Sequence, residues 1–201
     1  NLGFGQTNVT GLITSDTEWA LTGSPYYLTG NVGVNNAELT IAAGCSIIFQ
    51  STNSLIVQEN GLINAQGTES SRIVFTSDGS SHSRRFQFDS DAIGTTFTSD
   101  TTFVSGSIFK YCDFTALGTV GSYANDNYNG NFVTNKDLLF SNCKFYNLSA
   151  GNAYSTGVDN RGCLVVFHDS QFEDNSCNIS LNGWFGTGSR KYYNCSIKNN
   201  T

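Results

Sequence analysis

The chain has 201 residues and a formal net charge of −6 at pH 7, with 38% hydrophobic and 13% charged residues. This length and hydrophobic content predict one folded domain, and abundant Asn, Ser, Thr and Gly favour short strands joined by tight turns. Basic residues form no cluster, so we expect no nucleic-acid partner, because phosphate recognition needs grouped Lys and Arg side chains. No segment approaches the roughly 20 apolar residues that cross a bilayer, so we expect no membrane span.

Residues 1–18 form a polar, weakly patterned opening segment. Gly3, Gly5 and Gly11 lie in it together with several threonines, a composition that disfavours a covering helix. We therefore predict an N-terminal arm or cap over residues 1–18, one form of which is an arm that reaches a neighbouring subunit.

Short apolar runs follow, separated by turns that contain Gly44, Gly61 and Gly67. Runs of this length, bounded by turn residues, are typical of strands. The runs occupy residues 39–41, 47–49, 55–57, 62–63 and 73–75.

The order of these signals resembles the opening coils of secreted right-handed parallel β-helix proteins, the pectate-lyase-like superfamily. The resemblance is carried by Trp19, residues 24–32, residues 39–41 with Gly44, Gly67 with Thr68, and residues 73–77. It implies an all-β fold, a right-handed parallel β-helix (a solenoid) that forms a single domain over residues 19–201. That superfamily includes polysaccharide lyases and hydrolases, adhesins and surface or fibre proteins, so the fold does not choose among activities.

Two segments do not follow the apolar pattern and are predicted to protrude as loops, near residues 78–107 and 118–134. If residues 84–91 form a strand with its phenylalanines inward, then Arg85, Asp89 and Asp91 line an outward face. Carboxylates beside a basic group suit polysaccharide cleavage, which makes these three residues the catalytic candidates. The alternative is an ordinary strand with a polar outer face.

From residue 109 onward, one pattern repeats: an aromatic residue, a small residue at +3 and a large apolar residue at +5. The repeats begin at Phe109, Phe140, Phe167 and Tyr192. Such a period indicates a stacked solenoid, and inward residues at 0, +3 and +5 require a corner, which we place at +2. Outward residues then pair by charge, Asp113 with Lys144 at +4. At +6, Glu173 pairs with Lys198.

The third repeat contains His168, Asp169 and Ser170, a set that suggests nucleophilic catalysis. The repeat, however, places His168 outward and Ser170 inward, at a position where the other repeats carry Cys. We therefore predict that Ser170 is a small packing residue.

The six cysteines contain no C-x-x-C pair and accompany only two His, so disulfides are expected and no metal or cofactor. Cys112 and Cys143 share one column on successive coils, about 4.8 Å apart, a separation that a disulfide accepts. Two buried free thiols are the alternative. The pairing of the other four cysteines stays open, and one possibility is a bond between stacked copies. These four are Cys45, Cys163, Cys177 and Cys195.

Five N-glycosylation triplets occur, at Asn8, Asn147, Asn178, Asn194 and Asn199. Together with the cysteines they favour N-linked glycans and an extracellular location, although a chain rich in Asn, Ser and Thr also produces such triplets by chance. The repeat runs to residue 201 without a polar cap, so we expect further residues or another copy to cover that end.

We expect a secreted, glycosylated structural or adhesive surface protein that is not an enzyme, with head-to-tail copies of itself in a filament as one form. The alternative is a β-helix protein that acts on carbohydrate, as a polysaccharide lyase or hydrolase does, or that only binds carbohydrate. In that case its site lies at Arg85, Asp89 and Asp91, while Tyr123 and Tyr128 stack on the sugars.

Overall fold

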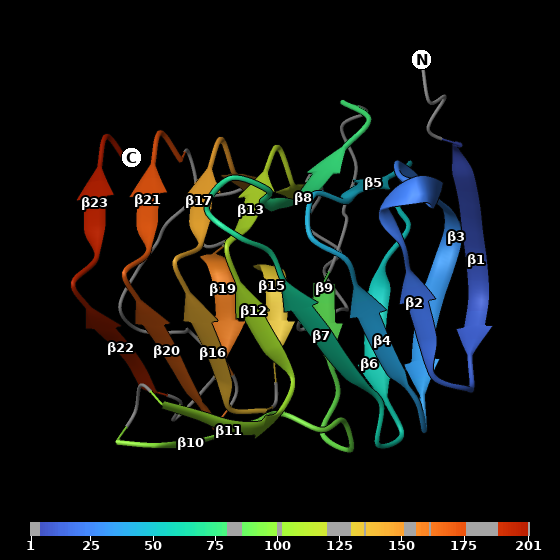
Figure 1. Cartoon of the computed structure of the whole chain (residues 1–201). Coiled ribbons are helices and arrows are strands. Elements are labelled where there is room, and N and C mark those ends of the chain that lie inside the picture. The colour runs from blue at the N-terminus through green and yellow to red at the C-terminus, as the bar shows by residue number, and fades with distance from the viewer. Residues whose placement is uncertain are drawn as a thin grey trace.

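The computed structural model describes residues 5–79, 86–99, 102–119, 130–134, 136–150, 156–160, 162–175 and 189–200. In this part of the chain the regular elements are β-strands, apart from one short 3-10 helix, η1 (Leu21–Gly23). The strands wind into a solenoid whose coils stack from one end of the molecule to the other (Figure 1). The described residues contain no helix that is long and apolar enough to cross a membrane.

Each coil passes through three faces, and the first face is a sheet of seven strands (Figure 1). Its strands in axial order are β2 (Thr17–Trp19), β4 (Glu38–Ile41), β7 (Leu62–Gln66), β12 (Ile108–Lys110), β16 (Leu138–Ser141), β20 (Leu164–His168) and β22 (Ser189–Tyr193).

The second and third faces share β3 (Tyr26–Asn35), which is long enough to pair with a strand of each, so hydrogen bonds join them into one sheet of 12 strands. The second face continues through β5 (Ser46–Phe49), β8 (Ile73–Ser77), β13 (Cys112–Thr115), β17 (Lys144–Tyr146), β21 (Gln171–Glu173) and β23 (Ser196–Lys198). The third continues through β6 (Leu55–Gln58), β9 (Phe86–Phe88), β15 (Gly130–Thr134) and β19 (Thr156–Asn160).

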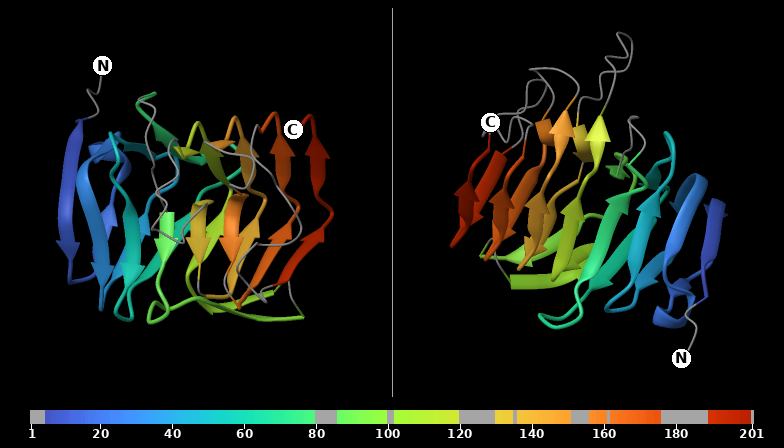
Figure 2. Two further views of the ribbon diagram at one scale, coloured as in Figure 1. Left: turned by 180° about the vertical axis from the view of Figure 1, so that it is seen from behind. Right: turned by 90° about the horizontal axis from the view of Figure 1, so that it is seen from above.

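Three further features complete the stack. The segment predicted as an arm or cap, residues 1–18, contains β1 (Thr7–Ile13), which runs parallel to β3, and the start of β2. The strands β14 (Gly118–Thr119) and β18 (Ser149–Ala150) form a small parallel pair. Among the described strands only the pair β10 (Thr95–Thr98) and β11 (Thr102–Gly106) is antiparallel. The fold is therefore a right-handed parallel β-helix, as the sequence predicts (Figure 2).

The predicted inward columns are confirmed. The aromatic residues at position 0 pair from strand to strand, and their rings stack with centroids 5.0 Å apart between Phe109 and Phe140 and 5.2 Å apart between Phe140 and Phe167. At +5, Phe145 stacks between Phe114 and Phe172 with both centroid distances at 4.9 Å. These rings fill the interior, and offset aromatic stacking adds to the free energy gained by burying them.

The predicted corner at +2 is confirmed by the backbone, which is left-handed there in all four repeats. The four residues are Tyr111, Asn142, Asp169 and Asn194, with φ between 49° and 55°. The structure also has a second left-handed corner at +7, which was not predicted. Its residues are Ala116, Asn147, Asp174 and Asn199, with φ between 51° and 55°.

The segment near 78–107 does not protrude along its whole length. Its strand β9 continues the third face and buries Phe86 and Phe88, while the β10–β11 hairpin contacts the first face and crosses its lower end (Figure 1). The outward residues Ile108, Leu139 and Val166 of that face are at most 4% exposed. An apolar outer row beneath the hairpin explains why this insertion lies against the stack.

Side-chain hydroxyls hold the base of the hairpin in the coil. Leu139 donates its backbone N–H to Thr95 Oγ1 over 3.1 Å, and Ile63 donates its N–H to Ser107 Oγ over 3.1 Å. Of the second predicted loop, residues 120–129 lie outside the described residues, whereas residues 130–134 are β15 of the third face. Both predicted loop segments therefore include strands of the stack.

The predicted Cys112–Cys143 disulfide does not form in the structure, where both residues are buried free thiols. They share a column of mostly small residues at the corner between the first and second faces. Cys112 Sγ lies 3.4 Å from the carbonyl oxygen of Ala65, and Cys143 Sγ lies 3.5 Å from that of Phe109, so each thiol donates toward the preceding coil. Cys45 and Cys195 make the same contact to Trp19 and Phe167. The thiols of this column therefore act as hydrogen-bond donors at the corner.

Of the two remaining cysteines, only Cys163 lies in the described part of the chain. Cys163 is also a buried free thiol, and its Sγ lies 3.4 Å from the carbonyl oxygen of Thr134. Cys177 lies outside the described residues.

Candidate functional site

The second face carries two outward rows of polar side chains that run along the solenoid axis. We call them the first and second outer rows. The first contains Asp113, Lys144, Gln171 and Ser196, and the second contains Thr115, Tyr146, Glu173 and Lys198. The predicted neighbours are confirmed, since Asp113 pairs in register with Lys144, and Glu173 with Lys198. Adjacent members of a row are one strand spacing apart, about 4.8 Å.

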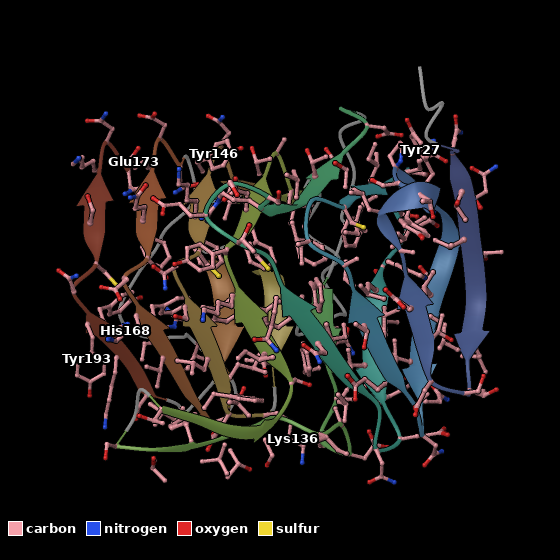
Figure 3. The ribbon with its side chains drawn as sticks, viewed as in Figure 1. Tyr27, Lys136, Tyr146, His168, Glu173 and Tyr193 are labelled. Atoms are coloured by element: carbon pink, nitrogen blue, oxygen red, sulfur yellow. The ribbon has the colours of Figure 1, made fainter. Side chains whose placement is uncertain are left out.

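A hollow of 210 Å³ lies over β17 and β21, between the two outer rows. The side chains of Lys144, Tyr146, Gln171 and Glu173 line it, together with Phe145. In Figure 3, Tyr146 and Glu173 lie on these neighbouring strands. The hollow therefore combines an aromatic ring, an amide, a carboxylate and an ammonium group within two coils.

Ion pairs determine which charged side chains near the hollow are available to a ligand. Arg72 Nε donates to Asp113 Oδ1 over 2.6 Å, so the carboxylate of Asp113 is already neutralised. At the other end, Lys198 Nζ lies 3.7 Å from Glu173 Oε1, and both side chains are well exposed. No ion pair to Lys144 occurs among the described residues. The Lys144 ammonium is thus the cation that the hollow offers to a ligand.

These groups can bind a polar, flat molecule. A tyrosine ring offers an apolar surface and a hydroxyl, while Gln, Glu and Lys side chains exchange hydrogen bonds with hydroxyl groups. The hollow is smaller than the usual pocket for a drug-sized ligand. It therefore suits one unit of an extended polymer better than a whole enclosed small molecule.

The two predicted catalytic residues that the structure describes, Asp89 and Asp91, lie away from the second face. Asp89 follows β9 on the third face, where its Oδ1 accepts a hydrogen bond from Gln87 Nε2 over 2.6 Å. Asp91 is exposed in the next turn, where its carbonyl oxygen accepts the Asn60 N–H. Arg85 lies outside the described residues. In the part of the chain that the structure describes, no group of three or more His, Cys, Asp and Glu side chains is arranged to hold a metal ion.

The His168, Asp169 and Ser170 set is not a nucleophilic site. His168 Nδ1 lies 2.7 Å from Asp169 Oδ2 on the outside of the coil, next to Tyr193 (Figure 3). Ser170 is fully buried, and its Oγ donates to the His168 carbonyl oxygen over 3.0 Å and accepts the Cys143 N–H over 3.1 Å. The hydroxyl is committed to the corner and cannot reach the imidazole ring.

The predicted glycosylation sites that the structure describes are all exposed: Asn8, Asn147, Asn194 and Asn199. Three of them occupy left-handed corners, a conformation that Asn adopts readily. The remaining site, Asn178, and the tyrosines Tyr123 and Tyr128 lie outside the described residues.

A second hollow, of 300 Å³, lies at the N-terminal end of the first face. It is lined by Asp16, Thr17, Glu18, Glu38 and Thr40. Asp16 Oδ1 accepts the backbone N–H of Glu38 over 2.8 Å, so this end of the solenoid is held together by a carboxylate. No sequence motif indicates this hollow. The second-face hollow does have a signal in the sequence, because Tyr146 and Glu173 both occupy position +6 of the repeat, the column in which Glu173 and Lys198 were expected to pair.

Comparison with known proteins gives one match. Residues 11–86 match the family model of the pectate-lyase like beta helix domain. No curated protein and no solved structure matches the chain. The matched segment runs from β1 to the start of β9, and the later coils extend the same three faces in register. The matched domain, over residues 11–86, and the parallel coils fit the pectate-lyase-like superfamily of right-handed parallel β-helices.

Proposed function

We propose that the chain is a structural or adhesive β-helix protein of the cell exterior that binds polysaccharide through the outer rows of its second face. The observation that carries this proposal is the hollow lined by Lys144, Tyr146, Gln171 and Glu173. Its groups match the hydroxyls and the flat apolar faces of sugar rings.

The shape of the second face supports a polymer as the ligand. The outer rows continue past the hollow in both directions, from Asp113 and Thr115 on one side to Ser196 and Lys198 on the other. A chain lying along these rows meets polar side chains at every strand spacing. Binding is then distributed over several weak contacts, as is usual for a shallow site.

The exposed glycosylation triplets support a place outside the cell. The acceptor asparagines Asn147, Asn194 and Asn199 are exposed at corners of the coil, outside the strands of the second face. Glycans at corners leave the outer rows of the second face free for a ligand. Mass spectrometry of protein made in a glycosylating host tests whether these sites are used.

Titration calorimetry with soluble neutral and uronic-acid-containing polysaccharides tests the binding site. We expect Tyr146→Ala to weaken binding roughly tenfold, which corresponds to about 1.4 kcal/mol, the order expected for a lost aromatic contact. Tyr27→Ala is the matched control, because Tyr27 faces outward on the same face four strands away from β17 (Figure 3). We expect that control to bind like wild type.

Two results would contradict the proposal. The first is that no polysaccharide binds, and the second is that Tyr27→Ala and Tyr146→Ala weaken binding equally. The same samples are also assayed for new reducing ends and unsaturated sugars. Cleavage that is lost in Asp89→Ala would replace this proposal with an enzyme whose site lies on the third face.

A further inference from the structure

Three charged side chains lie close together beside the hollow of the second face: Arg72, Asp113 and Lys144. Arg72 immediately precedes β8, while Asp113 and Lys144 are neighbours in register on β13 and β17. Neighbouring strands are about 4.8 Å apart, so a lysine side chain at position 144 is long enough to reach the Asp113 carboxylate. The structure pairs that carboxylate with Arg72 instead, whose Nε donates to Asp113 Oδ1 over 2.6 Å.

The guanidinium group of Arg72 is fixed in this position. Its Nη2 donates to backbone carbonyl oxygens of two coils, that of Cys112 over 3.2 Å and that of Asn142 over 2.7 Å. The side chains of Arg72 and Asp113 are 16% and 13% exposed, so their charges cancel largely out of contact with solvent. Arg72 therefore satisfies the Asp113 carboxylate without offering its own charge to a ligand.

The ammonium group of Lys144 is left for the hollow. Lys144 lines the hollow together with Glu173, and among the described residues it forms no ion pair. The Glu173 carboxylate has Lys198 as its partner, at 3.7 Å. When Arg72 and Asp113 are counted as well, three cations face two carboxylates, so one positive charge remains at this hollow in a chain of formal net charge −6.

We propose that Arg72 is a positioning residue of this hollow and that the polymer bound there carries acidic groups. Because Arg72 occupies the Asp113 carboxylate, that carboxylate does not pair with Lys144, and the Lys144 ammonium remains available for a carboxylate or a sulfate of the ligand. Resting on the proposed function, this assignment adds the chemical class of the polysaccharide. It also adds a residue outside the lining of the hollow that determines this class.

Removing the guanidinium group should redirect Lys144. In Arg72→Met the Asp113 carboxylate is left without its partner, and a mostly buried carboxylate strongly favours an ion pair over isolation. Lys144 is the neighbouring cation in register, so its ammonium turns from the hollow toward Asp113. The acidic groups of a ligand then lose their partner, whereas its hydroxyl groups keep Tyr146 and Gln171.

Titration calorimetry with three polymers tests this assignment: a neutral polysaccharide, the same polysaccharide carrying sulfate groups, and a uronic-acid polysaccharide. We expect wild type to bind acidic polymer more tightly than neutral polymer, and the two acidic polymers show which acidic group the hollow takes. Arg72→Met should lower the affinity for acidic polymer roughly tenfold, as expected for a lost hydrogen bond between charged groups, and leave the neutral polymer unchanged. Lys144→Met should have the same effect.

The double variant, Arg72→Met with Asp113→Asn, is the decisive sample, because it also removes the carboxylate that competes for Lys144. Its preference for acidic polymer should return, although the guanidinium group is still absent. Lys136→Met is the matched control, since it removes one positive charge far from Tyr146 and should bind like wild type (Figure 3). All variants are measured below their Tm, and far-UV circular dichroism checks that they are folded.

Limited acetylation without ligand, followed by mass spectrometry, reports the pairing of Lys144 directly. The Lys144 amine should react more slowly in Arg72→Met than in wild type, because an adjacent carboxylate favours the protonated form of an amine. Its reactivity should recover in the double variant, with Lys136 of the same digest as the internal reference. Arg72→Gln, which keeps an amide donor for the carbonyl oxygens, replaces Arg72→Met in both measurements if that variant does not fold.

Two results would overturn the assignment while leaving polysaccharide binding in place. One is wild-type protein that binds acidic and neutral polymers equally. The other is a folded Arg72 variant that keeps both its preference for acidic polymer and the reactivity of Lys144. If no polymer binds to wild type, the proposed function fails, and the assignment fails with it.

Discussion

Arg72 ties three consecutive coils together, and its removal is predicted to be the most costly single change among the charged residues of the second face. Its Nε donates to Asp113 Oδ1 over 2.6 Å. Its Nη2 donates to the carbonyl oxygens of Cys112, over 3.2 Å, and of Asn142, over 2.7 Å. The guanidinium carbon also lies 5.7 Å from the centre of the Tyr111 ring. Arg72→Met keeps the apolar stem and removes all of these contacts.

The expected loss follows from burial. The side chains of Arg72 and Asp113 are only 16% and 13% exposed, so the pair lies close to the buried limit, at which removing one partner costs about 3–5 kcal/mol. Because some solvent still reaches the carboxylate, we expect about 3 kcal/mol. For a domain of this size, 1 kcal/mol shifts Tm by roughly 2–4 °C, so Arg72→Met should lower Tm by about 6–12 °C.

Thermal and urea unfolding measure this loss, and Lys198→Met is the matched control. The Lys198–Glu173 pair has a longer distance, 3.7 Å, and its side chains are 66% and 40% exposed. Removing such a surface pair should cost about 1 kcal/mol or less. Adding Asp113→Asn to Arg72→Met should recover part of the stability, because the unpaired carboxylate is then gone. Equal losses in Arg72→Met and Lys198→Met would refute the reasoning.

Three further predictions concern the interior. Asn175 is 1% exposed, and its side-chain amide forms hydrogen bonds with Leu148, Phe145 and Asn200. Asn175→Ala should therefore lower the free energy of unfolding, measured in urea, by about 2–3 kcal/mol. A loss below about 1 kcal/mol would contradict this. A Cβ at Gly61 would lie 2.0 Å from the Val34 carbonyl oxygen, so Gly61→Ala should prevent the native turn and reduce soluble yield, whereas a normally folded variant would show that the turn can shift. Burial raises the pKa of the Cys112 thiol well above its ordinary value. The thiol therefore loses its proton at a lower pH in the unfolded chain than in the folded one, so the free energy of unfolding should fall as pH rises past about 8.5. Cys112→Ser should reduce that slope in Tm measured against pH, and an unchanged slope would assign it to other groups.

The inward columns could be predicted because packing repeats in every coil. Phe140 and Phe167 occupy equivalent positions, and each needs an aromatic neighbour above and below, so the same residue type returns in the sequence. The corner at +2 was equally visible through Asn142 and Asp169. The corner at +7 could not be predicted in this way, because Ala116 takes the same left-handed conformation although alanine is not a residue type that favours it.

The parts that could not be predicted depend on segments without a repeat. The hairpin packs on Leu139 through a hydroxyl of Thr95, and this contact joins residues 44 positions apart. The catalytic hypothesis at Asp89 rested on a correct strand, since Phe86 and Phe88 are inward, but nothing in the sequence showed which face that strand would join. The disulfide hypothesis at Cys112 used strand spacing alone and did not consider the carbonyl oxygens that a thiol can contact at the corner.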